Sequence, residues 1–281
     1  MPVFLEAGKE VNGHTVEKSL GGGGEGHAYL ARTKEGTRVV LKQLAISATS
    51  RDDKAERERF HRLKRLFGLK HECVAKTIET FKHDGALYLV SEYVDGRPLR
   101  AFLESGTKFS VMEAGRIAHN TLDGLAWLHA QEVIHRDIKP ENLIVKRGSK
   151  GNLKTKIIDL GAALHMGLSR VTVRGVVGTP AYMAPELWSG PSGAISSTVD
   201  QFAVGVVTYE ILTGRHPFAA DTSTGFFVKV LSGEYPPLGT TVRGAPAELE
   251  AWIARLLSPN PSDRYPSADD ALRALEIALR G

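Results

Sequence analysis

One stretch of the chain places an acid, an amine and an amide at fixed offsets, and it reads His135-Arg136-Asp137-Ile138-Lys139-Pro140-Glu141-Asn142-Leu143. Asp137, Lys139 and Asn142 supply the three groups, and Pro140 stiffens the backbone between the last two. The apolar run 143–145 follows at once and is typical of a short buried strand. Any loop can carry these residue types by chance, but this order and spacing favour a catalytic loop that leads into a hydrophobic core.

The composition is that of an ordinary globular protein with enough apolar material for a sizeable core. The chain has 281 residues, of which 42% are hydrophobic and 24% charged, so one large domain and two lobes both fit its length. The net charge of +4 is mild and no basic tail accompanies it, which argues against nucleic-acid binding. The single cysteine, Cys73, argues against an internal disulfide and a cysteine-based metal site, and it is compatible with a reducing cytoplasm.

The sequence gives no sign of membrane insertion or export. No apolar run reaches the ~18 residues of a membrane span, and residues 1–6 lack the charged and apolar zones of a signal peptide. We therefore expect a soluble, cytoplasmic chain, while a membrane segment beyond either end of a shortened chain stays an open alternative.

A glycine run lies between two expected strands, 14–20 and 27–32, and a third expected strand follows at 37–44. The glycines follow the pattern Gly21-x-Gly23-x-x-Gly26-x-Ala28, and Lys42 lies on the third strand. The run is either a floppy hairpin or a hairpin whose backbone approaches phosphate groups, which glycines allow because no Cβ intervenes.

The charged segment 51–70 has apolar residues at helical spacing, so we expect an amphipathic helix there. Its basic face is either a solvated surface or a docking surface for an acidic partner. Glu58 lies one turn before Arg62 on the same face, and these two side chains could pair with each other.

Two further segments carry clear helix signals. Ser110 and Glu113 form a capping box at the start of a helix that runs to about residue 130 and leads into the catalytic-loop stretch. The segment 200–213 is apolar nearly all round, which is typical of a buried helix, and Gly214 is a plausible C-cap.

The remaining motifs follow strands or close the second half of the chain. A separate strand is expected at 86–94. A hairpin with expected strands 143–146 and 153–158 ends on Asp159-Leu160-Gly161. Residues 178–186 then read Gly-Thr-Pro-Ala-Tyr-Met-Ala-Pro-Glu.

Together these motifs resemble those of protein kinases, and the resemblance covers roughly residues 14–279. The stretch 135–142 is similar to the catalytic loop, the glycine pattern with Lys42 to the glycine-rich loop and its strand lysine, 159–161 to the Asp-Phe-Gly motif, and 184–186 to the Ala-Pro-Glu that closes the activation segment. Within the family, the chain is more similar to bacterial eukaryotic-like Ser/Thr kinases.

The resemblance implies an α+β, bilobal kinase fold. A small β-rich N-lobe would comprise residues 1–92, with the glycine-rich loop and the regulatory helix. A larger, mainly helical C-lobe would comprise residues 93–281, with the catalytic loop, the activation segment and the substrate site. The two lobes together would form one kinase domain.

The resemblance also implies a role for each motif residue. Asp137, Lys139 and Asn142 would be catalytic, and Asn142 and Asp159 would bind Mg²⁺, or Mn²⁺ in its place. The residues expected around ATP are Leu20, Gly21, Gly23, Gly26, Ala28, Val40, Lys42, Ser91, Glu92, Val94 and Ile144. Two of these depart from the family pattern, because Ala28 stands for a valine and Val40 for a smaller residue.

The partner of the strand lysine departs further from the family. Kinases pair that lysine with a glutamate of the regulatory helix, whereas Arg62 or Leu63 holds the corresponding position here. Glu58 is the candidate partner of Lys42 if the helix is shifted by one turn.

Regulatory and structural roles follow from the same resemblance. The candidate regulatory phosphosites are Ser169, Thr172 and Thr179. The residues with implied structural roles are Glu186, Asp200 and Arg264. Arg264 would form an ion pair with Glu186, and Asp200 would tie to the backbone of the catalytic loop.

The implied function is a serine/threonine protein kinase that transfers the γ-phosphate of ATP to Ser and Thr hydroxyls and autophosphorylates its activation segment. Lys139 and Thr179 are the residues that imply Ser/Thr rather than Tyr specificity. One alternative is a kinase-fold regulatory or scaffold protein with weak catalysis, and another is a kinase of small molecules. The expected partners are protein substrates and a second copy of the chain, for trans-autophosphorylation, and no nucleic acid.

Overall fold

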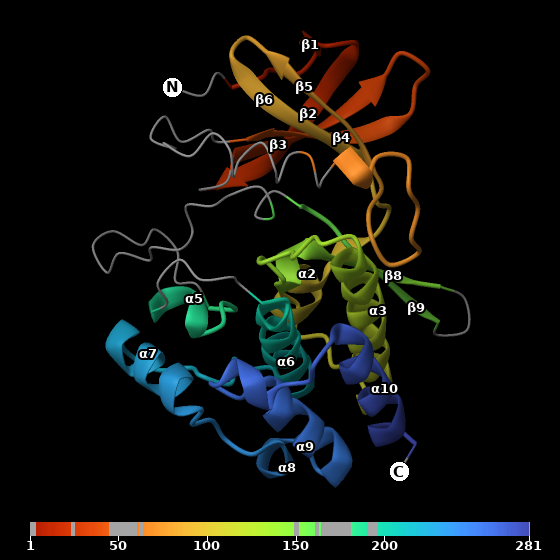
Figure 1. Ribbon diagram of the computed structural model, residues 1–281. Helices are drawn as coiled ribbons and strands as arrows, with labels where there is room; N and C mark the ends of the chain where they lie inside the picture. The colour runs from red at the N-terminus through yellow and green to blue at the C-terminus, as the bar shows by residue number, and fades with distance from the viewer. Residues whose placement is uncertain are drawn as a thin grey trace. The chain divides into compact units, whose positions relative to one another are not determined.

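The computed structural model describes residues 4–23, 26–44, 61, 64–148, 152–160, 163, 181–189 and 196–280. Its contacts divide the chain into two compact units (Figure 1). Unit 1 comprises Met1–Val94 with Asp159–Gly167, and unit 2 comprises Asp95–Ile158 with Leu168–Gly281. Each unit is described below by itself.

Unit 1 is built on an antiparallel sheet with the strand order β1-β2-β3-β4-β6-β5. The strands are β1 (Glu10–Val11), β2 (His14–Gly23), β3 (Gly26–Thr33), β4 (Arg38–Leu44), β5 (Thr77–His83) and β6 (Ala86–Glu92). The three strands expected around the glycine run and the strand expected after residue 86 are therefore confirmed, the last ending at Glu92.

The core of this sheet follows from the period-two alternation of apolar side chains along its strands. Val16, Tyr29, Leu41 and Val90 come from four different strands, and each is at most 1% exposed. Because these side chains are buried on one face of the sheet, the pairing register of the strands is fixed. A slip of one residue would turn them to the opposite face. This register also places the residues of the glycine hairpin opposite one another.

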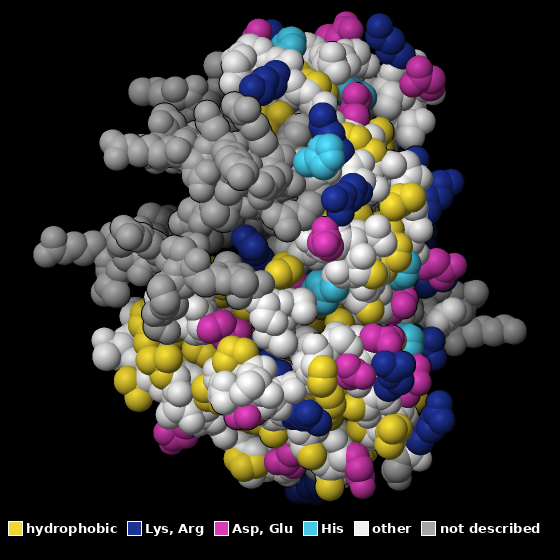
Figure 2. Space-filling model, viewed as in Figure 1, with side chains coloured by type: hydrophobic (Ala, Val, Ile, Leu, Met, Phe, Trp, Pro, Cys, Tyr) yellow, Lys and Arg dark blue, Asp and Glu magenta, His cyan; other side chains and the backbone are white. Residues whose placement is uncertain are grey.

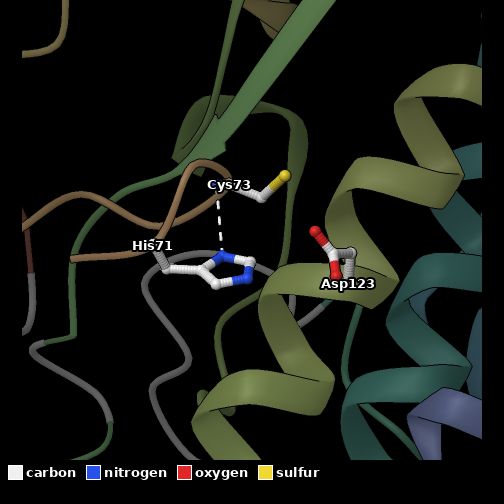
Figure 3. A group of neighbouring side chains, drawn as sticks. All are labelled: His71, Cys73 and Asp123. Carbon is white, nitrogen blue, oxygen red and sulfur yellow. Dashed lines mark hydrogen bonds between the residues drawn. The ribbon is translucent and has the colours of Figure 1, made fainter.

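A short turn precedes β5 in the same unit. The backbone N–H of Cys73 donates a hydrogen bond to Nδ1 of His71 at 3.2 Å (Figure 3), and His71 pairs with Val74 in an isolated bridge. Cys73 is buried and carries a free thiol. The expected helix at 51–70 lies largely outside the described residues.

Unit 2 contains a small sheet and most of the helices (Figure 1). The sheet has the order β7-β8-β9, with β7 at Arg97–Pro98, β8 at Leu143–Arg147 and β9 at Leu153–Ile157. The helical elements are α2 (Leu99–Glu104), α3 (Val111–Ala130), η1 (Pro140–Asn142), α5 (Glu186–Ser189), α6 (Thr198–Thr213), α7 (Ser223–Ser232), α8 (Leu238–Thr241), α9 (Ala247–Leu256), η4 (Pro261–Asp263) and α10 (Ala268–Ala278). The hairpin expected at 143–158 is confirmed as β8 and β9.

Helix α3 begins where the capping box predicted. The Ser110 hydroxyl accepts from the backbone N–H of Glu113 at 3.2 Å, and the Glu113 carboxylate accepts from the backbone N–H of Ser110 at 2.9 Å. Two donors that the first helical turn leaves unpaired are thereby satisfied. The rigid helix ends at Ala130, a few residues before the catalytic-loop stretch.

Helix α6 is the buried centre of unit 2, as its apolar sequence predicted, and it packs against α3 and α9. Gly214 ends it in the left-handed conformation, with φ of 73°, and its N–H donates to the carbonyl of Glu210. Glycine adopts this conformation without the steric cost that a Cβ brings. Asp200 near the helix start is 1% exposed, so this carboxylate needs partners inside the unit.

Two surface features complete the description. On the face drawn in Figure 2, hydrophobic side chains gather over α7, where Val228 and Leu231 are exposed. Lysine and arginine side chains are interspersed with aspartate and glutamate over much of the rest of that face. Within the described ranges, no helix has both the length and the apolar character needed to cross a membrane.

Candidate active site

The carboxylate of Asp137 is held by two neighbours from its own loop. Nδ2 of Asn142 donates to Oδ2 of Asp137 and to the Asp137 backbone carbonyl, each at 2.8 Å. Nζ of Lys139 donates to Oδ1 of Asp137 at 2.9 Å. The turn η1, which starts at Pro140, brings Asn142 back toward Asp137. The three side chains that the sequence singled out therefore converge on one carboxylate within unit 2.

The Asp200 carboxylate binds the backbone of this loop. Its carboxylate accepts hydrogen bonds from the backbone N–H groups of His135, at 2.9 Å, and Arg136, at 2.7 Å. Nε2 of His129 lies 2.8 Å from Oδ2 of the same carboxylate. Burial by itself would raise the pKa of Asp200, but the hydrogen bond and charge of His129 outweigh it and hold the pKa below its usual value.

The backbone at Arg136 adopts the left-handed region, with φ of 66°, which costs free energy for a residue with a Cβ. The two hydrogen bonds from the loop backbone to Asp200 hold this conformation in place. The strained residue directly precedes Asp137, so the backbone geometry sets the direction in which the Asp137 side chain leaves the loop.

His135 links the loop to the end of the β8–β9 hairpin. Its Nδ1 accepts from the backbone N–H of Asp137 at 3.2 Å, so Nε2 carries the proton and donates to the carbonyl of Ile158 at 3.1 Å. The backbone N–H of Ile158 in turn donates to the carbonyl of Asn142 at 2.9 Å. The buried imidazole thus ties the start of the segment to Ile158, and the Ile158 N–H holds its end at Asn142.

In unit 1, Lys42 and Asp159 form a close ion pair. Nζ of Lys42 lies 2.7 Å from each carboxylate oxygen of Asp159. The side chains are 10% and 26% exposed, respectively, so the charges are partly shielded from water and attract each other more strongly than surface charges do. Asp159 also adopts a left-handed backbone conformation, with φ of 67°, at the point where the chain leaves β9.

The glycine hairpin joins β2 to β3 in unit 1. Gly21 lies opposite Ala28 and Gly23 lies opposite Gly26 across the hairpin. Gly21 and Gly26 have φ values of 116° and 134°, which favour glycine because a Cβ would clash with the backbone. The expected hairpin is therefore present, although residues 24 and 25 at its tip lie outside the described part of the chain.

His27 packs over the glycine hairpin and explains the glycine at position 22. A Cβ at Gly22 would lie 2.3 Å from Nδ1 of His27, a distance that no side chain could occupy without displacing the ring. Nε2 of His27 is 2.7 Å from the hydroxyl oxygen of Ser19, and the rings of Phe4 and Tyr29 contact the imidazole. This arrangement had no signal in the sequence beyond the glycine itself.

The other residues expected around ATP lie on identifiable strands of the two units. Val40 on β4 is the register partner of Ser91 on β6, and Glu92 ends β6. Ile144 on β8 is 8% exposed and belongs to unit 2. The expected residues in unit 1 are Leu20, Gly21 and Gly23 on β2, Gly26 and Ala28 on β3, Val40 and Lys42 on β4, Ser91 and Glu92 on β6, and Val94 after it.

Glu186 and Arg264 form an ion pair in unit 2 in which Arg264 is buried and Glu186 is partly exposed. Nη1 and Nη2 of Arg264 donate to the two carboxylate oxygens of Glu186 at 2.6 and 2.9 Å. Its remaining donors reach the backbone carbonyls of Ser258, at 2.9 Å, and Thr198, at 3.0 Å. The Arg264 side chain is 0% exposed, so these partners replace the water that the guanidinium loses.

Four predicted residues cannot be placed. The candidate lysine partner Glu58 and the candidate phosphosites Ser169, Thr172 and Thr179 lie outside the described residues. Conversely, sequence reasoning missed His129, Arg100 and Glu210, which the structure brings to Asp200 and to Tyr182. No spacing rule connects these residues, because their partners are distant in the chain.

Each unit carries donors of its own that suit phosphate chemistry, Lys42 and Asp159 in unit 1 and Asp137 and Asn142 in unit 2. Asp159 offers carboxylate oxygens, and Asn142 offers Oδ1, because its Nδ2 already points to Asp137. Lys42 offers a cation for phosphate oxygens. Asp137 lies at hydrogen-bonding distance from an ammonium and an amide, which hold its carboxylate in a defined orientation. Such groups can accept a proton from a hydroxyl and neutralise phosphoryl charge.

Comparison with known proteins gives a consistent result. The family model described as "Protein kinase domain" matches residues 14–274. Serine/threonine-protein kinase PknJ of Mycobacterium bovis is 30% identical over 99% of this chain and 47% of its own length. Pkn1 of Myxococcus xanthus is 32% identical over 93% of this chain and 38% of its own length. PrkC of Bacillus subtilis is 28% identical over 97% of this chain and 41% of its own length. The chain spans less than half the length of each of these relatives.

Solved structures share the fold. The crystal structure of the Mycobacterium tuberculosis PknI kinase domain matches with a TM-score of 0.73, at 22% identity, over 98% of this chain and all of that one. At this identity the match speaks for the fold alone. The expected bilobal α+β fold is thereby confirmed.

Proposed function

The chain belongs to the protein kinase family, and from that premise we propose that it transfers the γ-phosphoryl group of ATP to serine and threonine hydroxyls of proteins. The expected family and enzyme class agree with relatives that are named serine/threonine-protein kinases. Because the chain spans less than half of these relatives, the activity of the whole protein is part of the proposal.

One observation carries the proposal: Asp137 is held at once by Lys139 and Asn142, on a loop whose backbone Asp200 fixes. In the proposed reaction the acceptor hydroxyl lies against the Asp137 carboxylate, which orients it and takes its proton. Lys139, whose ammonium is already beside Asp137, neutralises charge on the phosphoryl group as it transfers. The anchored loop keeps these groups in position without reorganisation during the reaction.

Lys42 and Asp159 would serve the nucleotide side of the reaction. The Lys42 ammonium would hold phosphate oxygens of ATP, and the Asp159 carboxylate and the Asn142 amide oxygen would hold Mg²⁺, or Mn²⁺ in its place. The bound cation would supply charge neutralisation for the phosphates of the nucleotide. The two side chains lie next to each other in unit 1, where Nζ of Lys42 is 2.7 Å from Oδ1 of Asp159.

The adenine end of ATP would lie among the expected apolar and hinge residues. Ala28 and Val40 would contact the base from the sheet of unit 1, and Ile144 from β8 of unit 2. Backbone groups near Glu92 and Val94 would hydrogen-bond the base, and the small side chain of Ser91 would leave room behind it. In this proposal residues 1–92 form the N-lobe and residues 93–281 the C-lobe of one kinase domain.

Control by phosphorylation is a further part of the proposal. Arg136 directly precedes Asp137, and a phosphate on Thr172 would pair with its guanidinium and link the activation segment to the catalytic loop. Ser169 and Thr179 are the alternative sites, and self-association would allow one copy to phosphorylate another. Thr172→Ala is expected to remove the activation that preincubation with ATP produces. Unchanged activation in that variant would exclude Thr172 as the switch.

A kinase-fold regulator with weak catalysis is the competing function, since Arg62 or Leu63 holds the position at which kinases carry the acidic partner of the strand lysine. Incubation of the purified chain with Mg²⁺ and ATP, followed by mass spectrometry, separates the two functions. The proposal predicts phosphoserine or phosphothreonine in the chain or in a generic protein substrate, lost in Asp137→Asn. Phosphate on small molecules but never on protein would instead favour a small-molecule kinase.

The remaining expectations concern partners and location. Protein substrates follow from the family. No nucleic-acid partner is part of the proposal, on the basis of the mild net charge of +4. The cytoplasm is the proposed location, on the basis of the composition and the single cysteine.

A further inference from the structure

His216 lies in the loop that follows α6, and both nitrogens of its ring have backbone partners. Nδ1 accepts a hydrogen bond from the backbone N–H of Phe218 at 3.2 Å. Nε2 lies 2.8 Å from the carbonyl oxygen of Ala181. Because a backbone N–H donates and a carbonyl accepts, the ring is neutral and carries its proton on Nε2. One imidazole therefore links the loop after α6 to the segment 181–185, which precedes α5.

The loop side of this link is fixed in the core of unit 2. The Phe218 side chain is buried, and its ring stacks on that of Phe202 in α6 with centroids 5.9 Å apart. Phe226 of α7 and Tyr182 pack against the imidazole itself, and each ring centroid is 5.6 Å from that of His216. Because α6 and α7 set the position of the imidazole, the imidazole in turn sets the position of the carbonyl that it binds.

The surroundings of the imidazole favour its neutral form. The loop and α7 place aromatic rings against it, and the titratable and charged groups near it are Tyr182, Glu210 of α6 and Arg100 of α2. Burial lowers the pKa of His216 below its usual value. The hydrogen bond to Ala181 and the Glu210 carboxylate oppose this shift without outweighing it, and Arg100 adds to it. The ring is therefore neutral at neutral pH.

The segment that His216 binds lies beside the catalytic loop. Nη2 of Arg100 donates to the hydroxyl of Tyr182, and Nε of Arg100 donates to Glu141 in η1 at 2.8 Å. Glu141 directly precedes Asn142, whose Nδ2 holds the Asp137 carboxylate. The segment 181–185 therefore borders the path of a substrate chain that brings its hydroxyl to Asp137.

We propose that His216 is a positioning residue for the protein substrate, whose neutral imidazole holds the segment 181–185 in the conformation that receives the substrate chain. This inference rests on the proposed protein kinase function, and His216 acts in it through the Ala181 backbone rather than on the reacting groups. Arg264 fixes Glu186 at the far end of the segment, and His216 fixes the carbonyl of Ala181 at the near end.

Protonation of His216 would break the link. A proton on Nδ1 would face the N–H of Phe218, so two donors would meet where one bond had formed. A charged imidazole in this partly buried place would also lack the water that stabilises it. The link is therefore complete above the unfolded pKa of about 6.5 and is lost as the pH falls through the lowered pKa of the folded state.

Two substitutions separate hydrogen bonding from titration and from packing. His216→Gln keeps an amide N–H that can reach the Ala181 carbonyl, but it does not titrate. His216→Phe keeps an aromatic ring beside Tyr182 and removes both hydrogen bonds. With myelin basic protein as substrate at about pH 7.5, His216→Phe should raise KM for that protein about tenfold, the effect of one lost hydrogen bond, and leave KM for ATP within about twofold. His216→Gln should stay near the wild type in both constants.

The pH profile is a readout that a merely structural role would not move. Between about pH 7.5 and about pH 5, kcat/KM of the wild type should fall about threefold or more relative to that of His216→Gln, because His216→Gln lacks the titrating imidazole. The other titrating groups are common to both proteins, so the ratio isolates His216. His119→Gln, which removes a histidine that is 37% exposed and pairs with Glu276, is the control and should keep the wild-type profile.

Parallel pH profiles of the wild type and His216→Gln, or an unchanged KM for myelin basic protein in a folded His216→Phe, would overturn the proposal. Hydrogen exchange of the amides in 181–185, measured without ATP, should be about tenfold faster in His216→Phe than in the wild type. If His216→Phe fails to fold, the same comparison between the wild type and His216→Gln at about pH 5 decides the matter. A wild type that phosphorylates no protein would contradict the proposed function, whereas equal exchange would overturn the role of His216.

Discussion

The ammonium of Lys42 lies 2.7 Å from both carboxylate oxygens of Asp159. The two residues are separated by 117 positions in the chain, and both belong to unit 1. The pair joins the strand β4 to the second residue after β9. In the proposed kinase reaction this is where the phosphates of ATP and a divalent cation meet the protein.

Lys42→Met should lower kcat/KM for a protein substrate by about a hundredfold to a thousandfold, the loss seen when one preorganised electrostatic donor is removed. The matched control is Lys82→Met, which removes an exposed lysine from the strand β5 of the same sheet. A radiolabelled ATP assay measures the rates of both variants, and their melting temperatures show whether each is folded. Wild-type rates in Lys42→Met would show that this ammonium does not act on the nucleotide.

The Asp200 carboxylate should stabilise the folded chain in a pH-dependent way. Asp200→Asn removes the charged acceptor of two loop N–H groups and should cost about 3 kcal/mol in the free energy of unfolding at neutral pH. The pKa of Asp200 is lowered in the folded state, so this contribution is complete above the unfolded value of about 4 and is lost as the pH falls through the folded value.

Denaturant unfolding of the wild type and Asp200→Asn across acidic pH measures this difference. The stability gap between the two should be constant above about pH 4 and should shrink below it. Asp269→Asn, on the exposed side of α10, is the control and should change the unfolding free energy little at any pH. A gap that stays constant down to the lowest pH would contradict the lowered pKa.

The ion pair between Arg264 and Glu186 should contribute strongly to the free energy of unfolding. Arg264→Met would leave the Glu186 carboxylate and three backbone carbonyls without their donor and should cost about 3–5 kcal/mol. Arg273→Met removes an arginine that is 64% exposed and pairs with Asp269 and Asp270, and it should cost less than about 1 kcal/mol. Urea midpoints of the two variants provide the comparison, and equal shifts would contradict the account.

Features encoded over a few residues could be predicted from the sequence. The capping box of Ser110 and Glu113 formed as expected because its two partners are three residues apart in the chain. The left-handed C-cap at Gly214 and the glycine hairpin formed for the same reason. In each case the local backbone conformation is decided by neighbouring residues, so a spacing rule is enough.

Contacts between distant residues could not be predicted in this way. His129 and Asp200 are 71 positions apart, and Arg100 and Glu210 are 110 apart. Their pairing depends on how α2, α3 and α6 pack, which no local pattern states. The family resemblance gave Lys42 and Asp159 their roles toward ATP and metal, but it did not give their contact with each other.

The most direct test of the account concerns Asp137, on which Lys139 and Asn142 converge. Wild type and Asp137→Asn are each incubated with Mg²⁺, ATP and a generic protein substrate, and phosphorylated residues are identified and quantified by mass spectrometry. The account predicts phosphoserine and phosphothreonine in the wild-type reaction, and a rate lower by about a hundredfold to ten-thousandfold in the variant, with the melting temperature preserved. Equal phosphorylation by the two proteins, or no transfer to protein by the wild type, would contradict it.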